Sequence, residues 1–146
     1  MVYKRLNYCA ITQSATYIVR PFVADERSSW YRTLHGYNTG CDIIASEVYS
    51  ACFGVVIQVG HTTQYTVTVQ YDANSCVRYA NLTDVDVSPG EPITTGRLIG
   101  HADEFVRVEY ATQSTEFTRW PVHIGTETYY KVDPESIVDG TSLITS

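Results

Sequence analysis

Few side chains in this chain of 146 residues could bind a metal ion or transfer a proton near neutral pH. Imidazole is the usual candidate for both tasks. The chain has four histidines, His35, His61, His101 and His123, and three of them are next to residues that favour turns. A register shift could bring His35 near Asp42, but one histidine and one carboxylate fall short of a usual zinc ligand set. We therefore expect histidines without a ligand role, and a metal site rebuilt from them stays an alternative.

The carboxylates and cysteines offer weaker candidates. Asp103, Glu104 and Glu109 could form an acid–base group, although acidic residues in such segments are usually solvated. The four cysteines show no C-x-x-C spacing, so the sequence does not predict a zinc ribbon. Buried free thiols are the expected state, with a disulfide as the alternative; the cysteines are Cys9, Cys41, Cys52 and Cys76.

Aromatic residues could supply a platform for sugar rings, but in an all-β protein they usually pack in the core. The candidates are Trp30, Tyr31, Tyr37, Trp120, Tyr129 and Tyr130.

Composition and charge exclude several classes of function. Hydrophobic residues make up 44% of the chain and charged residues 18%, which is typical of a globular domain rather than a disordered one. The net charge is −6, and the ten basic residues are scattered, so we expect no nucleic-acid partner. No apolar run approaches the ~20 residues of a spanning helix, so we expect no membrane span. The N-terminus lacks the apolar region of a signal peptide, which predicts residence in the cytoplasm of the producing cell or in a virion.

Strand patterns dominate the chain. Residues 65–71 alternate Tyr and Val with Thr and Gln, and residues 76–80 return after a turn, which predicts a hairpin. Turns are expected at 88–90 and 95–96. In residues 105–110, Val106, Val108 and Tyr110 share one face. Short helices are predicted only near 24–31 and 134–138. The fold class is therefore a single all-β domain over residues 1–146, an antiparallel sandwich or barrel-sandwich hybrid.

Several segments, taken in order along the chain, match the motifs of one known family. Residues 38–45 read NTGCDIIA, residues 79–82 read YANL, residues 105–109 read FVRVE and residues 131–134 read KVDP, and residues 87–100 are punctuated by glycines. The first two segments resemble the H-x-G-x-D-I opening and the Y-A-H-L strand of lysostaphin/LytM-type zinc endopeptidases, which cut peptide cross-links in bacterial peptidoglycan. Residues 87–100 resemble that family's glycine-punctuated hairpin, 105–109 occupy the place of H-L-H-F-E, and 131–134 resemble the terminal V-D-P. The resemblance covers about residues 33–138, with N- and C-terminal extensions, and implies the lysostaphin-type fold.

The same resemblance implies that the catalytic machinery has been lost. The family's metal ligands correspond to Asn38, Asp42 and Arg107, and its two catalytic histidines correspond to Asn81 and Phe105. A guanidinium has no acceptor atom and cannot ligate a cation, while amide and phenyl groups cannot shuttle protons. Only His101 to Glu104 separate Gly100 from Phe105, so the loop that usually precedes H-L-H-F-E is expected to be shortened.

The carry-over also places Arg107 beside Asp42, where a guanidinium could pair with the carboxylate and replace the charge of the ion. Glu109 lies on the same strand face and could compete for Arg107.

These observations predict no zinc or other cofactor and no enzymatic activity. They indicate a structural or interaction module, most simply a phage tail or tail-tip component. Its partners would be proteins, either virion components or further copies of itself, and peptidoglycan could remain a ligand. Two alternatives stay open: a pseudoenzyme that binds the cell wall or regulates hydrolases, and an active endopeptidase with a relocated metal site.

Overall fold

The computed structural model describes residues 16–20, 41–113, 121–132 and 143–145, and every regular element among them is a strand. Among the described residues, no helix could span a membrane. The strands are β1 (Thr16–Arg20), β2 (Cys41–Ile44), β3 (Glu47–Tyr49), β4 (Gly54–His61), β5 (Tyr65–Asp72), β6 (Ser75–Val85), β7 (Pro92–Ile93), β8 (Leu98–Thr112), β9 (Pro121–Ile124), β10 (Glu127–Val132) and β11 (Leu143–Thr145).

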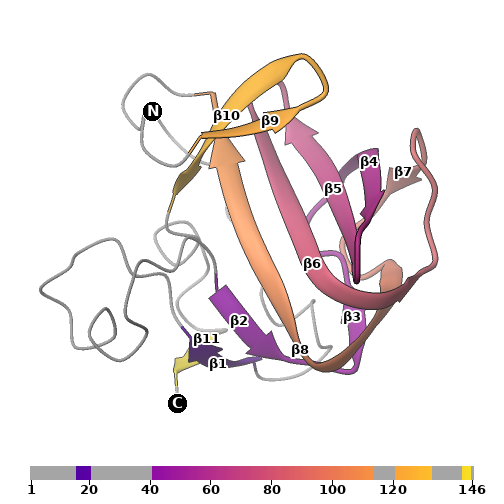
Figure 1. The fold of residues 1–146 in the computed structure, drawn as a ribbon, viewed down its shortest axis with the longest axis vertical. Coiled ribbons are helices and arrows are strands. Elements are labelled where there is room, and N and C mark those ends of the chain that lie inside the picture. Colours follow the sequence, from indigo (N-terminus) through magenta and orange to yellow (C-terminus); the bar gives the residue numbers. More distant parts are fainter. Residues whose placement is uncertain (1–15, 21–40, 114–120, 133–142, 146) are drawn as a thin grey trace, which may run out of the picture.

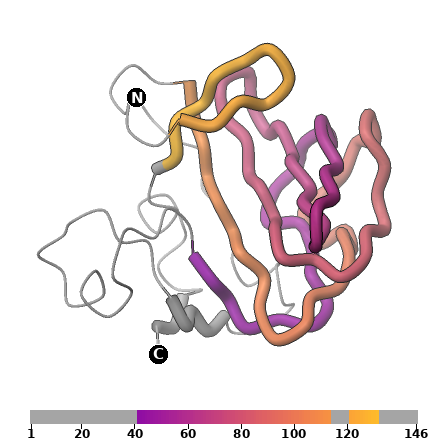
Figure 2. Tube along the Cα trace, viewed as in Figure 1, coloured from indigo at the N-terminus to yellow at the C-terminus, as the bar shows by residue number. Residues whose placement is uncertain are grey.

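The strands form one sheet organised around β8, the long central strand in Figure 1. The main order is β11-β1-β2-β8-β6-β5-β4-β7, and all described pairings except β1 with β11 are antiparallel. β8 also pairs with β3 near its start and with β10 near its end. Figure 2 shows the β9–β10 hairpin crossing over the upper ends of β6 and β8. The predicted all-β antiparallel fold is confirmed.

The local signals in the sequence account for the observed strands and turns. The predicted hairpin forms between β5 and β6, with Ala73 and Asn74 at the turn. Turns at 89–90 and 95–96 are also present, and Gly90 and Gly96 both have a φ of 88°. A residue with a side chain is strained in that region, which explains glycine at both positions. The two predicted helices, near 24–31 and 134–138, lie outside the described residues.

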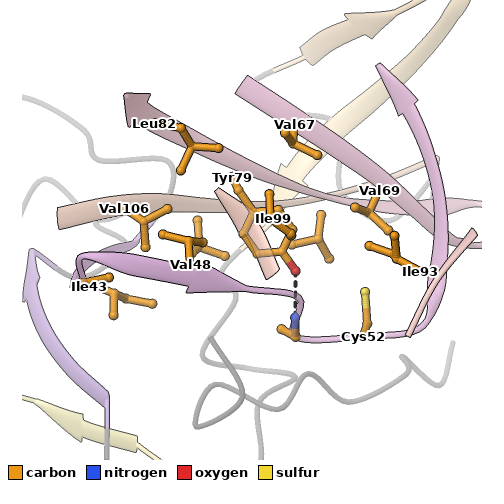
Figure 3. Packing of buried hydrophobic residues seen from close by; sticks show 14 of the residues in the cluster. Ile43, Val48, Cys52, Val67, Val69, Tyr79, Leu82, Ile93, Ile99 and Val106 are labelled. Carbon is orange, nitrogen blue, oxygen red and sulfur yellow. Dashed lines mark hydrogen bonds between the residues drawn. The ribbon is translucent and has the colours of Figure 1, made fainter. Parts of the chain in front are cut away.

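The main core lies on one face of the sheet, where alternate residues of β5, β6 and β8 meet the short strands β2 and β3 (Figure 3). Val106, Val108 and Tyr110 are fully buried there, as their alternation predicted. Tyr79 is also fully buried, and its hydroxyl accepts a hydrogen bond from the backbone N–H of Ala51 at 2.9 Å. Burial raises the pKa of the Tyr79 hydroxyl, so it remains a neutral partner for that N–H.

A smaller apolar cluster lies on the opposite face of the sheet, which we call the outer face. The β9–β10 hairpin supplies Ile124 and Tyr129, which pack with Cys76 of β6 and Ala111 of β8. This hairpin covers one end of the outer face. Beyond the hairpin, the described part of that face carries polar and charged residues together with Ala80 and Phe105.

Candidate functional site

An open groove of about 410 Å³ lies on the outer face, beyond the part that the hairpin covers. Its floor comes from β2, β5, β6 and β8, and the β4–β5 turn forms one side. The turn is held by the N–H of Thr62, which donates to the carbonyl of Gln64. The lining residues are Asp42, Thr62, Thr63, Gln64, Thr66, Ala80, Asn81, Phe105 and Arg107. The groove thus contains all four described positions that the family resemblance singled out.

Asp42 and Arg107 face each other across the β2–β8 ladder. Arg107 Nη1 donates to Asp42 Oδ1 at 3.4 Å. The Asp42 side chain is 6% exposed, whereas that of Arg107 is 27% exposed. Antiparallel pairing places their Cβ atoms within reach because directly opposed residues point to the same side. The structure therefore brings together the carboxylate and the guanidinium that the sequence analysis paired.

Glu109 joins this pair to a larger network. The same face of β8 presents Arg107 and Glu109, and Arg107 Nε donates to Glu109 Oε2 at 3.4 Å. Two further cations contact Glu109 more closely: Arg78 Nη1 at 2.9 Å and Lys131 Nζ at 2.7 Å. Glu109 is only 4% exposed, so the expectation that it is solvated was wrong. Three cations provide the compensation that a buried carboxylate needs.

The missed members of the network come from neighbouring strands. Arg78 is directly opposite Glu109 on β6, and this contact could have been inferred by aligning the predicted hairpin with residues 105–110. Lys131 arrives from β10, which pairs with β8 through Lys131 and Ala111. No local pattern in the sequence indicates that second pairing.

Asn81 and Phe105 flank a wide bulge between β6 and β8. Ala80 is opposite Arg107 and Leu82 is opposite Ala102, so Asn81 alone faces residues 103–106. Asn81 has a φ of 67° and Glu104 a φ of 84°, both in the left-handed region. Asn81 Nδ2 donates to the carbonyl of Phe105 at 2.9 Å, which satisfies a backbone group that the bulge removes from the ladder. β8 runs through this region as a continuous strand, in agreement with the expected shortening of the loop.

The other candidate residues are dispersed. His61 ends β4 and stacks on Tyr65 with ring centroids 4.1 Å apart, so it lies just before the turn rather than in it. His101 lies within β8, where its Nδ1 contacts Asp84 Oδ1 at 2.9 Å, and that interaction raises the pKa of His101. His123 contacts Thr128 in the β9–β10 hairpin. Asp103 and Glu104 are exposed and are not part of the Glu109 network.

Three of the four cysteines fall within the described residues, and all three are buried and none of them forms a disulfide. Burial raises the pKa of the Cys76 thiol to about 12, so it is protonated at neutral pH. Cys9, His35 and Asn38 lie outside the described residues. So do Trp30, Tyr31, Tyr37 and Trp120, and of the proposed aromatic platform only Tyr129 and Tyr130 are described. Tyr129 is buried where the hairpin packs on the sheet, as expected of a packing residue.

The described side chains of the groove do not fit a zinc ion. Asp42 can donate an oxygen, but the Arg107 guanidinium, 3.4 Å from that carboxylate, would present a positive charge to the metal. Zinc at catalytic sites takes imidazole, thiolate or carboxylate ligands, usually three from the protein. Across residues 41–113 and 121–131, no cluster of three such side chains is close enough to hold a metal ion.

The fold defines a class of protein: an all-β domain with the fold of the lysostaphin-type peptidases. The family model for peptidase family M23 matches residues 36–126. The chain belongs to peptidase family M23. A search of curated protein sequences found no match.

Solved structures show the same fold at low sequence identity. A chain of the SpoIIQ–SpoIIIAH pore-forming complex aligns with a TM-score of 0.70 and 14% identity, covering 93% of this chain and 92% of that one. Lysostaphin aligns with a TM-score of 0.66 and 14% identity, covering 97% of this chain and 60% of lysostaphin. The catalytic domain of the prophage-encoded M23 protein EnpA from Enterococcus faecalis aligns with a TM-score of 0.62 and 13% identity, covering 82% and 89%.

Proposed function

We propose that this protein is a non-catalytic member of peptidase family M23 that serves as a structural or interaction module. The observation that carries the proposal is the Arg107 guanidinium in the groove, 3.4 Å from the Asp42 carboxylate. A cation fixed there repels a metal ion and supplies no ligand. Asn81 and Phe105 offer no group that could activate water at neutral pH. Asp42 and Arg107 thus act as a structural pair in place of a metal, and the domain needs no cofactor.

Two of the structural matches support a role in assemblies. The SpoIIQ–SpoIIIAH structure is of a pore-forming complex, so this fold occurs in a protein that works through protein partners. EnpA is prophage-encoded, which supports a phage context. We propose that the protein is a component of a phage tail or tail tip, with other virion proteins or copies of itself as partners. Mass spectrometry of purified virions tests this location, and absence of the protein from intact particles would contradict it.

The loss of metal chemistry is tested by measuring zinc in protein purified without chelator and with zinc in the growth medium. Elemental analysis is expected to find much less than one zinc per chain, and added zinc is expected to leave the melting temperature unchanged. About one zinc per chain, with a rise in melting temperature and a chelator-sensitive peptidase activity, would contradict the proposal. That result would instead favour the relocated metal site.

A gain-of-metal variant provides the matched control for this measurement. The double substitution Asn38→His and Arg107→His restores the ligand set that the family resemblance implies around Asp42. This variant is expected to bind more zinc than the parent protein, because two imidazoles join one carboxylate. The single variant Asn38→His keeps the Arg107 guanidinium 3.4 Å from the Asp42 carboxylate, and it should bind no additional zinc.

A second candidate function, binding of the cell wall, is favoured by the groove itself. The described part of the groove remains open at about 410 Å³ even though one end of the outer face is covered by the hairpin. A domain that binds the wall or regulates a hydrolase would use this groove to hold a wall peptide. Co-sedimentation with insoluble peptidoglycan tests the idea, and recovery of all the protein in the supernatant would argue against it.

A further inference from the structure

The edge of the sheet at β4 is only partly paired. The short strand β7 pairs with residues 54–55, and backbone hydrogen bonds from Val56 to Gly90 and Glu91 extend this cover by one residue. From there on, no described segment pairs with this side of β4, along residues 57–61. Figure 1 shows β4 and β7 together at one edge of the sheet. An edge strand presents a row of backbone N–H and C=O groups that can pair with a strand of another chain.

This edge also lacks the charges that usually protect an edge strand. Proteins block such edges with charged side chains, proline or bulges. Residues 48–71 contain no Asp, Glu, Lys, Arg or Pro. The one bulge of β4 falls between Val56 and Gln58, where the cover by β7 ends, and the pairing with β5 is regular beyond it. The chain as a whole has a net charge of −6, so two copies repel over much of their surface, but not along this neutral segment.

Gly60 supplies a second observation at the same edge. A Cβ atom at Gly60 would meet nothing within 4 Å. By contrast, a Cβ at Gly54 would lie 2.4 Å from the carbonyl oxygen of Gln70, and one at Gly100 would lie 2.3 Å from that of Asp84. The fold therefore requires glycine at the other two positions but not at Gly60. Glycine inside a strand weakens it and often marks a place where another backbone approaches closely.

The residues of this edge are complementary to a second copy of themselves. Gln58 and Gly60 are opposite Thr68 and Thr66, so they point to the outer face, where Thr66 lines the groove. Val59 lies between them and packs against the main core. Consider two antiparallel copies of β4, related by a two-fold axis that passes through the sheet at Val59. Val59 is then opposite the same residue of the second copy, and each Gln58 side chain lies over the open space at the other copy's Gly60.

We infer that residues 57–61 of β4 pair with the same residues of a second copy, which joins two sheets into one across a dimer. The inference rests on the proposed function, because it gives the interaction module one partner and one surface. β7 covers the first part of each β4 and the second copy covers the remainder. A neutral edge suits this occupant, because it holds no charge that would select an oppositely charged partner and none that would repel an identical chain.

Sedimentation velocity over a wide range of protein concentrations tests the dimer, and hydrogen exchange locates its interface. A dimer is expected, and amides within residues 57–61 should exchange more slowly in the dimer than after dilution to the monomer. Amides of the β9–β10 hairpin serve as the internal control and should exchange equally in both states. A protein that stays monomeric at every concentration overturns the inference. A dimer whose added protection lies outside residues 57–61 overturns it as well.

Two matched double variants test the register. Gln58→Lys with Gly60→Lys places lysines directly opposite one another across the two-fold axis, which is expected to weaken the dimer by about tenfold or more. Gln58→Lys with Gly60→Glu places lysine opposite glutamate and should keep the dimer. The first variant lowers the overall negative charge and the second leaves it unchanged, so general repulsion between copies predicts the reverse order. Equal dimerisation of the two variants, or the reverse order, overturns this pairing.

Both variants are expected to fold, because a side chain added at Gly60 meets nothing in its own chain, and thermal melting checks this. If either fails to fold, hydrogen exchange on the unmodified protein decides. A monomer that contains no zinc and is found in virions rejects the dimer while leaving the proposed function intact. A β4-paired dimer of a zinc-containing, active peptidase would instead reject the proposed function and leave the pairing in place.

Discussion

Strand β8 presents two different environments on its two faces. Val106, Val108 and Tyr110 point into the main core and are fully buried. Arg107 and Glu109, which alternate with them, point to the outer face and bind charged residues from β2, β6 and β10. The apolar face is stabilised by removal of surface from water, a force that does not depend on direction. The charged face depends on particular partners, so its stability is sensitive to the loss of any one of them. The first face supports the fold, and the second contains the charged residues on which the proposed loss of metal binding rests.

The largest effect is expected from removing the central carboxylate of the charged face. Glu109→Gln keeps the shape of the side chain but leaves Arg78, Lys131 and Arg107 without that negative charge. Uncompensated charges of this kind cost about 3–5 kcal/mol of unfolding free energy. Urea unfolding monitored by fluorescence measures the change. Glu127→Gln, at an exposed hydrogen bond to Gln113, is the control and should change stability by less than about 0.5 kcal/mol.

Truncating Val108, the neighbouring residue on the apolar face, should lower the unfolding free energy by a smaller amount. Val108→Ala removes two buried methyl groups, worth about 0.8 kcal/mol each, and leaves a small cavity. We expect a loss of ~2–3 kcal/mol in the same unfolding experiment. Finding that Val108→Ala costs clearly more than Glu109→Gln would reverse the comparison. It would mean that solvent or side-chain rearrangement compensates the three cations.

A smaller effect is expected at Arg107, because its side chain is 27% exposed and water replaces part of its interaction. Arg107→Ala leaves Asp42 buried without this partner, and we expect a loss of ~1–3 kcal/mol. The double variant with Asp42→Asn tests whether the two residues act as a pair. Its loss should be smaller than the sum of the two single losses. A negligible change in melting temperature for Arg107→Ala would show that the pair has no structural role.

The difference between the two faces also sets how much could be predicted from the sequence. The buried triplet of β8 and the β5–β6 hairpin follow from alternation, because a strand buries every second residue. The opposition of Asp42 and Arg107 could be predicted because both lie in segments that resemble the M23 family. The contact of Lys131 with Glu109 could not be predicted, because it depends on the register between β10 and β8. The bulge opposite Asn81 could not be predicted either, since four residues of β8 face one residue of β6 without any glycine or proline to mark the site.

The smallest effect is expected at an exposed counterpart of the Arg78–Glu109 pair. His101 of β8 lies opposite Asp84 of β6 in the same ladder, but both side chains are about half exposed. The hydrogen bond and charge of Asp84 raise the pKa of His101 above its ordinary value of 6.5. The protonated pair therefore stabilises the fold below pH 6.5, and this contribution is lost as the pH rises through the raised pKa.

Asp84→Asn keeps the acceptor oxygen but removes the charge, so the pKa of His101 should fall in an NMR titration. The stability difference between the two proteins should be detectable near pH 5.5 and should vanish by pH 9. A difference that persists at high pH would show that the neutral hydrogen bonds of Asp84, including the one from the His101 backbone N–H, outweigh the charge.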